Sequence, residues 1–591
     1  MADTNRDGRV NASDNVEGKG IWTAARGALF LPNIGDTDRR CSKLINLDTS
    51  RPEIDDCHDA SDNVLRNAGF LAPLLTLPIP ISDLANGTHG SINVTGLAAA
   101  QYVRVFAKRD HGWEYVSSNT TFGIPELAKG LELGIDARDV RRPGGWDGWT
   151  KVYFTVHSPN GSASDSVALR VAPVLMHHHA QAAERVFTID DNVALTLPEF
   201  NQALQAAVTT AGITEPLYKF ADGDKWVQDW FEPAYASIPG PDGPVVIRIM
   251  VRSFQNRRSG GQVFTDLRAA TIGAAQHVAD GDTIDSTGNL ETIPPYTHEG
   301  KSYPAGRAIM GSWNGRLPYM FDFLRAQELQ DPVELDTTWL IVGHVDEFVQ
   351  FLPAPNTERG WVIMADDPLG GLELLRNASK AGHGDVPGLS RKRLPTDPDI
   401  ACLPNMTLNA VLELANLTTL NEFAAERINY NLDILKKATG VSDDEIFRVP
   451  ALFYNSEGWN CVRFSKLQAR TEGDEILGEY NPLDIVRAAG TEIRDDLSFH
   501  GRLADPDPKI IAHYPAVING VVLSNKHYLA PDPWGPVIDG KDIIAEAVRK
   551  VYAEAAGYEV IFMDDWFSHH MTGGEIHCGT NVWRNADDPW W

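Results

Sequence analysis

In the first 170 residues, apolar side chains alternate with polar ones in short runs. Lys151–Val156 and Ser166–Val171 each place an apolar residue at every second position, which is typical of a strand with one buried face. Clusters of glycine and asparagine, such as Pro143–Gly145, separate the runs and indicate turns. We therefore expect residues 1–170 to form an all-β domain of the sandwich type.

From about residue 171 the spacing of apolar residues changes, and helical patterns alternate with strand-like ones. The apolar residues of 200–208 and 544–555 recur at helical spacing, and Gly557 follows the second group as a helix stop. The next segment, Tyr558–Met563, is a short apolar run that predicts a strand. This alternation predicts an α/β domain over residues 171–591.

Length and charge narrow the class of protein. The chain has 591 residues, more than the roughly 250–300 at which a single hydrophobic core stops growing, so we expect more than one domain. The longest apolar runs, such as Ala516–Leu523, have the length of strands, and none approaches the roughly 20 residues of a membrane helix. The net charge of −28 disfavours nucleic acid and favours cationic substrates, although it can also serve solubility alone. We predict neither a nucleic-acid nor a membrane partner.

Five cysteines are present, so at least one thiol has no partner within the chain. Cys41 and Cys57 lie in one early segment, and Cys402 and Cys461 lie in one later region. We predict the disulfides Cys41–Cys57 and Cys402–Cys461, which leave Cys578 as the free thiol.

Eight asparagines stand in the Asn-x-Ser/Thr context of N-glycosylation. Together with cysteines that can pair, this number favours a secreted, N-glycosylated protein. The residues after Met1 show neither the basic nor the apolar part of a leader, so we expect a mature or truncated chain. The asparagines are Asn11, Asn86, Asn93, Asn119, Asn160, Asn377, Asn405 and Asn416.

Four residues from distant parts of the chain could act together on a planar cation. A cysteine nucleophile such as Cys578 needs a partner that moves protons, and His344 can do so near neutral pH. Asp346 follows two residues later, so on a strand both side chains would face the same side. Asp229 adds a second carboxylate, and two carboxylates suit a guanidinium with its five donors in a fixed fork. Taken singly, a His-x-Asp pair or a free cysteine is more often structural.

Longer segments resemble the protein-arginine deiminases. The resemblance covers the α/β region nearly end to end and the β region more loosely. It implies an immunoglobulin-like sandwich over residues 1–170, followed by an α/β five-bladed propeller, the pentein fold, over residues 171–591. The chain starts where the family's middle domain starts, so we expect the family's first domain to be absent. The segments concerned are Gly343–Phe348, Gly574–Asn581, Tyr303–Arg307, Trp534–Gly540 and the terminal Trp590 and Trp591.

This resemblance implies hydrolysis of peptidyl-arginine to peptidyl-citrulline and ammonia. Cys578 would attack the guanidinium carbon and form a covalent thiouronium intermediate. Asp229 and Asp346 would hold the guanidinium. His344 would protonate the departing ammonia and then activate water.

Two more residues resemble substrate-binding positions of the family. Arg257 would bind backbone carbonyls of the substrate, and Trp226 would pack on the arginine stem. The expected partners are therefore proteins or peptides that contain arginine. We expect a monomer, because the family's first domain is absent. The three histidines at 177–179 are interpreted as a surface segment between domains rather than a metal site.

The resemblance also implies calcium as a cofactor, which prefers oxygen ligands from several segments. One site of the family carries over to this chain. Its ligands would be the side chains of Gln228, Glu232 and Glu291 and the backbone carbonyls of Thr287 and Leu290.

A second calcium site of the family does not carry over. Trp230 stands where a carboxylate is expected, and Arg252 stands where an aspartate is expected, although Ser253 and Asn256 remain. We expect this ion to be lost, with Arg252 supplying fixed positive charge instead. Dependence on calcium would then be weaker than in the family.

The N-terminus contains a third candidate for calcium. Asp3, Asn5 and Asp7, followed by Asp14 at the twelfth loop position, resemble an oxygen-rich calcium loop without the helices of an EF-hand. A solvated acidic loop is the alternative. Nearby acidic residues that could complete the site are Asp36, Asp38, Asp55, Asp56, Asp59 and Asp62.

Two other functions remain open from the sequence. One is a deiminase of free arginine or another small guanidine compound, which the β region and Arg257 disfavour. The other is a secreted, non-catalytic calcium-binding recognition module. The intact set of Asp229, His344, Asp346 and Cys578 argues against that module.

Overall fold

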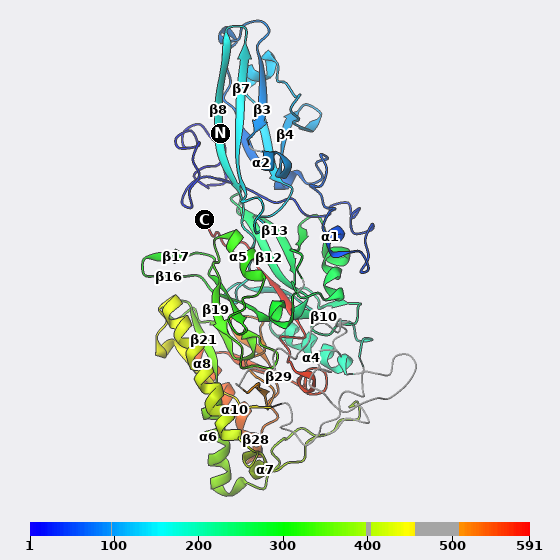
Figure 1. The fold of residues 1–591 in the computed structure, drawn as a ribbon, viewed down its shortest axis with the longest axis vertical. Coiled ribbons are helices and arrows are strands. Elements are labelled where there is room, and N and C mark those ends of the chain that lie inside the picture. Colours follow the sequence, from blue (N-terminus) through cyan, green and yellow to red (C-terminus); the bar gives the residue numbers. More distant parts are fainter. Residues whose placement is uncertain (96, 195, 280, 398–402, 456–507) are drawn as a thin grey trace.

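The computed structural model forms an elongated molecule, in which the strands of the N-terminal part lie at one end of the long axis (Figure 1). The helices that follow in the chain lie nearer the other end. The structure describes residues 1–591 except 96, 195, 280, 398–402 and 456–507.

Residues 28–171 contain two four-stranded sheets that share one apolar core. Val167 and Leu169 of one sheet and Val105 and Ile135 of the other are buried in that core. The predicted strands at 151–156 and 166–171 are confirmed, since both lie in the long antiparallel pair β7 and β8. In sheet order, the strands are β1 (Ala28–Phe30), β8 (Gly161–Val171), β7 (Trp149–Ser158) and β3 (His89–Val94), and then β2 (Ala72–Leu75), β6 (Glu132–Ala137), β4 (Val103–Arg109) and β5 (Gly112–Tyr115).

The later part of the chain repeats one strand pattern in five small sheets. The strands are β9 (Leu175–Met176), β10 (Ala183–Ile189), β11 (Tyr218–Phe220), β12 (Phe231–Ile238), β13 (Val245–Arg252), β14 (Ile272–Ala275), β15 (Leu290–Ile293), β18 (Arg307–Ser312), β19 (Val333–Asp336), β20 (Val349–Pro353), β21 (Trp361–Asp367), β22 (Ile446–Pro450), β25 (Val521–Val522), β26 (His527–Pro531), β29 (Glu559–Met563) and β30 (Asn581–Arg584). In strand order, the sheets are β30–β10–β11, β9–β12–β13–β14, β15–β18–β19, β20–β21–β22 and β25–β26–β29.

In each of these sheets a central strand pairs antiparallel with one neighbour and parallel with the other. The antiparallel neighbours are β30, β12, β15, β20 and β25, and almost all of their residues are buried. We call these five the inner strands. Their burial places five chain segments in the interior of the later part of the molecule.

Helical segments connect the parallel strands, as expected for an α/β domain. The predicted helices at 200–208 and 544–555 are confirmed, and the second ends at Gly557 with a positive φ of 72°. The predicted strand at 558–563 is β29. Among the described helices, none is both long enough and apolar enough for a membrane crossing. The helices of this part are α4 (Leu197–Thr210), α5 (Met320–Gln327), α6 (Pro368–Ala378), α7 (Leu408–Leu412), α8 (Leu417–Thr439) and α10 (Ile543–Ala556).

Shorter elements complete the described chain. They are α1 (Arg51–Ile54), α2 (Leu97–Tyr102), α3 (Ile124–Lys129), β16 (Tyr296–His298), β17 (Lys301–Tyr303), β23 (Phe453–Tyr454), β24 (Ile511–Ala512), β27 (Val537–Ile538) and β28 (Lys541–Asp542).

Of the two predicted disulfides, Cys41–Cys57 is formed, so that prediction is confirmed. Cys402–Cys461 lies outside the described residues. Cys578 is a free, buried thiol, as predicted.

The interpretation of the three histidines at 177–179 as a surface segment is wrong. His177 and His178 are buried, and Nδ1 of His179 lies 2.9 Å from the carbonyl oxygen of Phe351. The segment follows β9, which pairs with the inner strand β12, so it continues into the interior rather than onto the surface. Burial lowers the pKa of all three imidazoles, which favours their neutral form.

Candidate active site

A short turn precedes each of the five inner strands, and residues of these turns surround the Cys578 thiol. The turn before β12 carries Asp229, and the turn before β15 carries Gly288. The turn before β20 carries Asp346, and the turn before β25 carries Asn519. Cys578 itself lies in the turn before β30. A repeated strand pattern therefore explains how positions so far apart in sequence can meet.

The four residues expected to be catalytic lie close together. Sγ of Cys578 is 3.8 Å from Oδ2 of Asp346. Nδ1 of His344 is 3.9 Å from Oδ1 of Asp229. The hydroxyl of Ser286 joins the second pair, because its oxygen is 3.0 Å from Oδ1 of Asp229 and 3.0 Å from Nε2 of His344.

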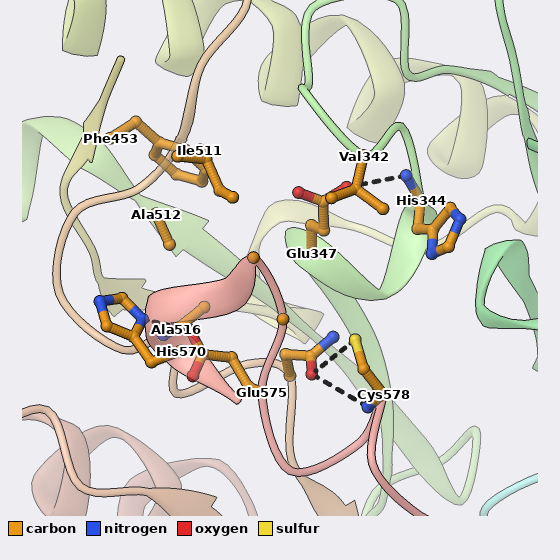
Figure 2. Close-up of a pocket in the computed structure, with 13 residues that line it drawn as sticks. Val342, His344, Glu347, Phe453, Ile511, Ala512, Ala516, His570, Glu575 and Cys578 are labelled. Carbon is orange, nitrogen blue, oxygen red and sulfur yellow. Dashed lines mark hydrogen bonds and ion pairs between the residues drawn. The ribbon is translucent and has the colours of Figure 1, made fainter. Parts of the chain in front are cut away.

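A pocket lies beside the thiol, and both Cys578 and His344 line it. Figure 2 shows these two residues on one side of the pocket and Phe453 and Ile511 on the other. The lining is mixed, because His570 and Glu575 also face the pocket, below Phe453 and Ile511 in this view. Glu347 lies between His344 and the two apolar side chains.

Glycine is required where two of the turns press against the site. A Cβ at Gly288 would stand 2.4 Å from Oδ1 of Asp229 and 2.8 Å from Nδ1 of His344. A Cβ at Gly574 would stand 2.6 Å from the Trp226 ring and 3.1 Å from Sγ of Cys578. Side chains at these positions would displace the groups that we expect to react.

The expectation that His344 and Asp346 lie on a strand is wrong. His344 precedes a 3-10 turn over Val345–Glu347, and Asp346 lies within it. The Glu347 carboxylate holds this turn, because its Oε1 accepts hydrogen bonds from the backbone N–H groups of Gly343 (3.0 Å) and His344 (2.8 Å). Local capping therefore forms a turn here in place of the strand considered from the His-x-Asp spacing.

The thiol is held in its protonated form. Burial raises the pKa of Cys578 well above its ordinary value, and the carboxylates of Asp346 and Asp229 raise it further. A cation placed between the thiol and these carboxylates would act in the opposite direction. The site is thus arranged so that a positively charged ligand favours the nucleophilic thiolate.

His577 connects Asp346 to a more distant carboxylate. Its Nδ1 is 2.8 Å from Oδ2 of Asp346, and its Nε2 is 3.4 Å from Oε1 of Glu291. Burial alone would lower the pKa of His577, but the hydrogen bond to Asp346 and the charge of Glu291 raise it above its ordinary value. His577 therefore orients Asp346 and partly compensates its charge.

The Arg257 guanidinium is bound to Asp229, one of the two carboxylates expected to hold the substrate. Its Nη2 is 2.8 Å from Oδ2 of Asp229, and its Nη1 is 2.7 Å from Oδ2 of Asp224. Arg257 and both carboxylates are buried. Trp226 is also buried and contacts the ring of His569, at 5.4 Å between ring centroids. In this state Asp229 already binds one guanidinium, which belongs to the chain itself.

The first predicted calcium set is gathered in one place. Nε2 of Gln228 is 3.1 Å from Oε2 of Glu232 and 3.4 Å from the carbonyl oxygen of Thr287. Leu290 and Glu291 begin the adjoining inner strand β15. Burial raises the pKa of Glu232, and the charge of Glu291 raises it further. Two buried carboxylates that repel each other beside backbone carbonyls form a donor set that fits calcium.

At the positions of the family's second calcium site, this chain has the aromatic ring of Trp230 and the guanidinium of Arg252. Trp230 is fully buried and packs on Phe220 at 5.1 Å. Nη2 of Arg252 donates a hydrogen bond of 2.8 Å to the carbonyl oxygen of Arg257. Arg252 therefore holds the segment that carries Arg257.

The N-terminal acidic loop is ordered by its own hydrogen bonds. The carboxylate of Asp3 accepts from the N–H groups of Asp7 (3.1 Å) and Gly8 (2.9 Å), and Nδ2 of Asn5 is 2.9 Å from Asp7. Oδ1 of Asp14 is buried without a partner. In the part of the chain that the structure describes, a close group of three carboxylates is found elsewhere, with oxygens within 4.8 Å of one another, at Asp36, Asp38 and Asp59.

Several residues of the site were not found from the sequence. His577 and Glu347 are neighbours of predicted residues, and that adjacency was the available signal. Ser286 and Asn519 lie in segments that look like ordinary turns, so only the sheet pattern locates them.

The fold and the site together define an α/β protein with a cysteine-centred site suited to a cation. The chain belongs to the protein-arginine deiminase family, whose model, described as "Protein-arginine deiminase (PAD)", matches residues 161–591. It is similar to protein-arginine deiminase type-4 of Mus musculus, with 26% identity over 100% of this chain and 82% of the relative. It is also similar to protein-arginine deiminase type-3 of Homo sapiens, with 27% identity over 100% of this chain and 81% of the relative.

Proposed function

We propose that this protein hydrolyses arginine side chains of proteins and peptides to citrulline and ammonia. The observation that carries the proposal is a buried thiol 3.8 Å from a carboxylate, at a place where an imidazole and a second carboxylate also converge. A guanidinium between the two carboxylates would place its carbon next to Sγ of Cys578. Membership of the family supports the same reaction.

In the first half of the reaction, the thiol proton of Cys578 passes to His344 and the sulfur attacks the guanidinium carbon. A C–S bond forms, one terminal C–N bond breaks, and the leaving nitrogen takes the proton from His344 to depart as ammonia. In the second half, His344 takes a proton from water, whose oxygen attacks the thiouronium carbon. The C–S bond then breaks and the ureido group of citrulline is released. Asp229 and Asp346 hold the cation throughout.

Substrate must replace Arg257 at Asp229. The present ion pair of 2.8 Å with Arg257 supports the proposal that this carboxylate binds a guanidinium. Once displaced, Arg257 would be free to bind backbone carbonyls of the substrate, as the resemblance implies. This exchange favours substrates that offer a peptide backbone as well as a guanidinium, and Trp226 would cover the arginine stem.

Calcium would be held by Gln228, Glu232 and Glu291 and by the carbonyls of Thr287 and Leu290. When bound, it would supply fixed positive charge beside two buried carboxylates. Gln228 immediately precedes Asp229 in the same turn, so the ion would fix the position of that carboxylate.

A reduced need for calcium follows from Arg252. Its hydrogen bond to the carbonyl of Arg257 orders the loop where the family's second ion would bind. We expect activity to remain in excess chelator, whereas complete loss restored cooperatively by several ions would contradict this part of the proposal. The loops at Asp3, Asn5, Asp7 and Asp14 are proposed as a structural calcium site of the β region.

We also propose a detailed fold for the two parts of the chain. The five sheets with one pattern support a five-bladed propeller over residues 171–591, and the two N-terminal sheets support an immunoglobulin-like domain over residues 1–170. Secretion is supported by the sequons, because seven of their eight asparagines are exposed and Asn11 is half-buried. We also propose a monomer.

One experiment tests the proposed activity. The protein is incubated with a peptide that contains one arginine and blocked ends, and in parallel with free arginine, each with and without calcium. We expect release of ammonia and formation of citrulline from the peptide. Conversion of free arginine alone would point to a small-molecule deiminase, and no conversion of either would point to a non-catalytic module.

A further inference from the structure

Four of the five turns before the inner strands contribute residues that the proposed reaction already uses or needs. The fifth turn, over residues 516–520 before β25, carries Asn519 at the position two residues before the strand. Asp229 and Gly288 stand at the same distance before β12 and β15. The sheet pattern thus places Asn519 where the other sheets place residues of the site.

Asn519 contacts the reacting atom directly. Its Oδ1 is 3.4 Å from Sγ of Cys578 and 3.4 Å from the backbone nitrogen of the same residue. Its Nδ2 donates to the backbone carbonyl of Asp346 at 3.3 Å, and its own carbonyl accepts the N–H of His577 at 3.2 Å. One amide therefore joins the turn of the nucleophile to the turn of the substrate carboxylate.

The turn that carries Asn519 is fixed from two sides. The hydroxyl oxygen of Tyr528 lies within hydrogen-bonding distance of the carbonyl oxygens of Val517 (2.7 Å) and Ile518 (2.9 Å). Nε2 of Gln350, from another sheet, donates to the carbonyl of Gly520 at 3.2 Å. Because Asn519 is itself 2% exposed, its amide has little freedom to turn away from the thiol. Such rigidity is what a group that orients a nucleophile needs.

We infer that Asn519 is a further catalytic residue, whose amide directs Sγ of Cys578 at the guanidinium carbon while it fixes the turn of Asp346. The inference rests on the proposed function. Of the two acceptors beside the thiol, Oδ1 of Asn519 is nearer (3.4 Å) than Oδ2 of Asp346 (3.8 Å), and this contact holds the sulfur in its orientation. Asp346 is also held by His577 and by the Glu347 carboxylate that caps its turn, so it should keep its place without Asn519. Loss of Asn519 should therefore act mainly on the sulfur, lowering kcat and leaving KM close to the wild-type value.

The test measures kcat and KM for a blocked arginine peptide with Asn519→Ala and Asn519→Asp. The alanine variant removes both hydrogen-bonding atoms. The aspartate variant keeps the shape but replaces the donor to Asp346 by an oxygen. We expect kcat to fall about 100-fold in each, the scale of a misplaced reacting group. A haloacetamidine peptide inactivates the thiol with saturation kinetics. Its maximal inactivation rate should fall in parallel with kcat in both variants, while the peptide concentration that gives half of this rate stays unchanged.

Asn431→Ala provides the matched control. Asn431 is also fully buried, and its amide also bonds to a backbone, at 2.8 Å to the carbonyl and 2.7 Å from the nitrogen of Asp336. We expect this variant to lose thermal stability and keep kcat. A folded Asn519 variant with wild-type kcat, or a fall that appears in KM alone or equally in the control, overturns the inference. A wild-type protein that releases no citrulline would instead refute the proposed function.

Discussion

Replacing Arg257 by glutamine separates two roles of this residue, namely the ion pairs with Asp224 and Asp229 and the proposed contact to the substrate backbone. The guanidinium lies between Asp224 and Asp229 at 2.7 and 2.8 Å, and the three side chains are each 8–9% exposed. Truncating one partner of a buried ion pair costs about 3–5 kcal/mol, because the remaining charge has no partner. Burial raises the pKa of Asp224 even with Arg257 beside it, and loss of Arg257 should raise this pKa further. The deficit of the variant relative to wild type should therefore grow as the pH rises above the Asp224 pKa of the folded wild type.

Binding of a small guanidine tests whether the loss of stability comes from the space that the Arg257 guanidinium leaves in this variant. In the Cys578→Ala background, methylguanidine can enter between Asp224 and Asp229, where the Arg257 guanidinium lay, without being hydrolysed. At about 100 times its Kd it should restore roughly 2.7 kcal/mol of the lost stability. It should also bind more tightly to Arg257→Gln than to the chain that retains Arg257, because it meets no competitor. A peptide substrate should instead show a lower kcat/KM with Arg257→Gln, since the contact to its backbone is lost.

The assay is urea unfolding at several methylguanidine concentrations, with Arg391→Gln as the control. Arg391 is also buried between two carboxylates, at 2.6 Å from Asp397 and 2.7 Å from Asp564. We expect a comparable loss of stability in the control and no restoration by methylguanidine. If Arg257→Gln is as stable as wild type, or if both variants are restored equally, Arg257 does not compete with substrate for Asp229.

Three other predictions concern separate parts of the molecule. Gly288→Ala should lower kcat/KM about 100-fold, because the new Cβ displaces Asp229 and His344, whereas Gly20→Ala, in open space, should not; equal activity of the two variants would contradict the site. Serine at both cysteines of the first disulfide, which are 16 residues apart, should cost about 3 kcal/mol of unfolding free energy, and an unchanged urea midpoint would contradict this. Burial beside the carboxyl group of Asp565 raises the pKa of Glu575 to about 8, so wild type should lose stability as the pH rises from the unfolded value near 4.3 towards that pKa. Urea midpoints should therefore show less pH dependence for Glu575→Gln, and an identical dependence would refute the shift.

Local elements were predictable from the sequence because their signals are local. The alternation in 151–156 gives β7, and helical spacing followed by Gly557 gives α10. Cysteine spacing gave the Cys41–Cys57 pair. The residues Cys578, His344, Asp346 and Asp229 could be named from their motifs, and the structure brings them together.

What the sequence did not reveal depends on contacts between distant segments. The five sheets share a strand pattern without a sequence repeat, since pairing constrains backbone direction more than residue type. The histidines at 177–179 look like a polar surface, but His177 packs inside against Gln181 and Tyr235. Asn519 resembles any turn asparagine until the strand that follows it is placed beside Cys578.

The central claim is that the Cys578 sulfur exchanges a guanidinium nitrogen for oxygen. The most direct measurement is the mass of a blocked arginine peptide, and the ammonia released, after incubation with wild type and with Cys578→Ala. We predict that wild type replaces one NH by O per arginine, with one ammonia for each, and that the variant leaves the peptide unchanged. An unchanged peptide with folded wild type in both calcium and chelator, or equal conversion by the variant, would contradict the account.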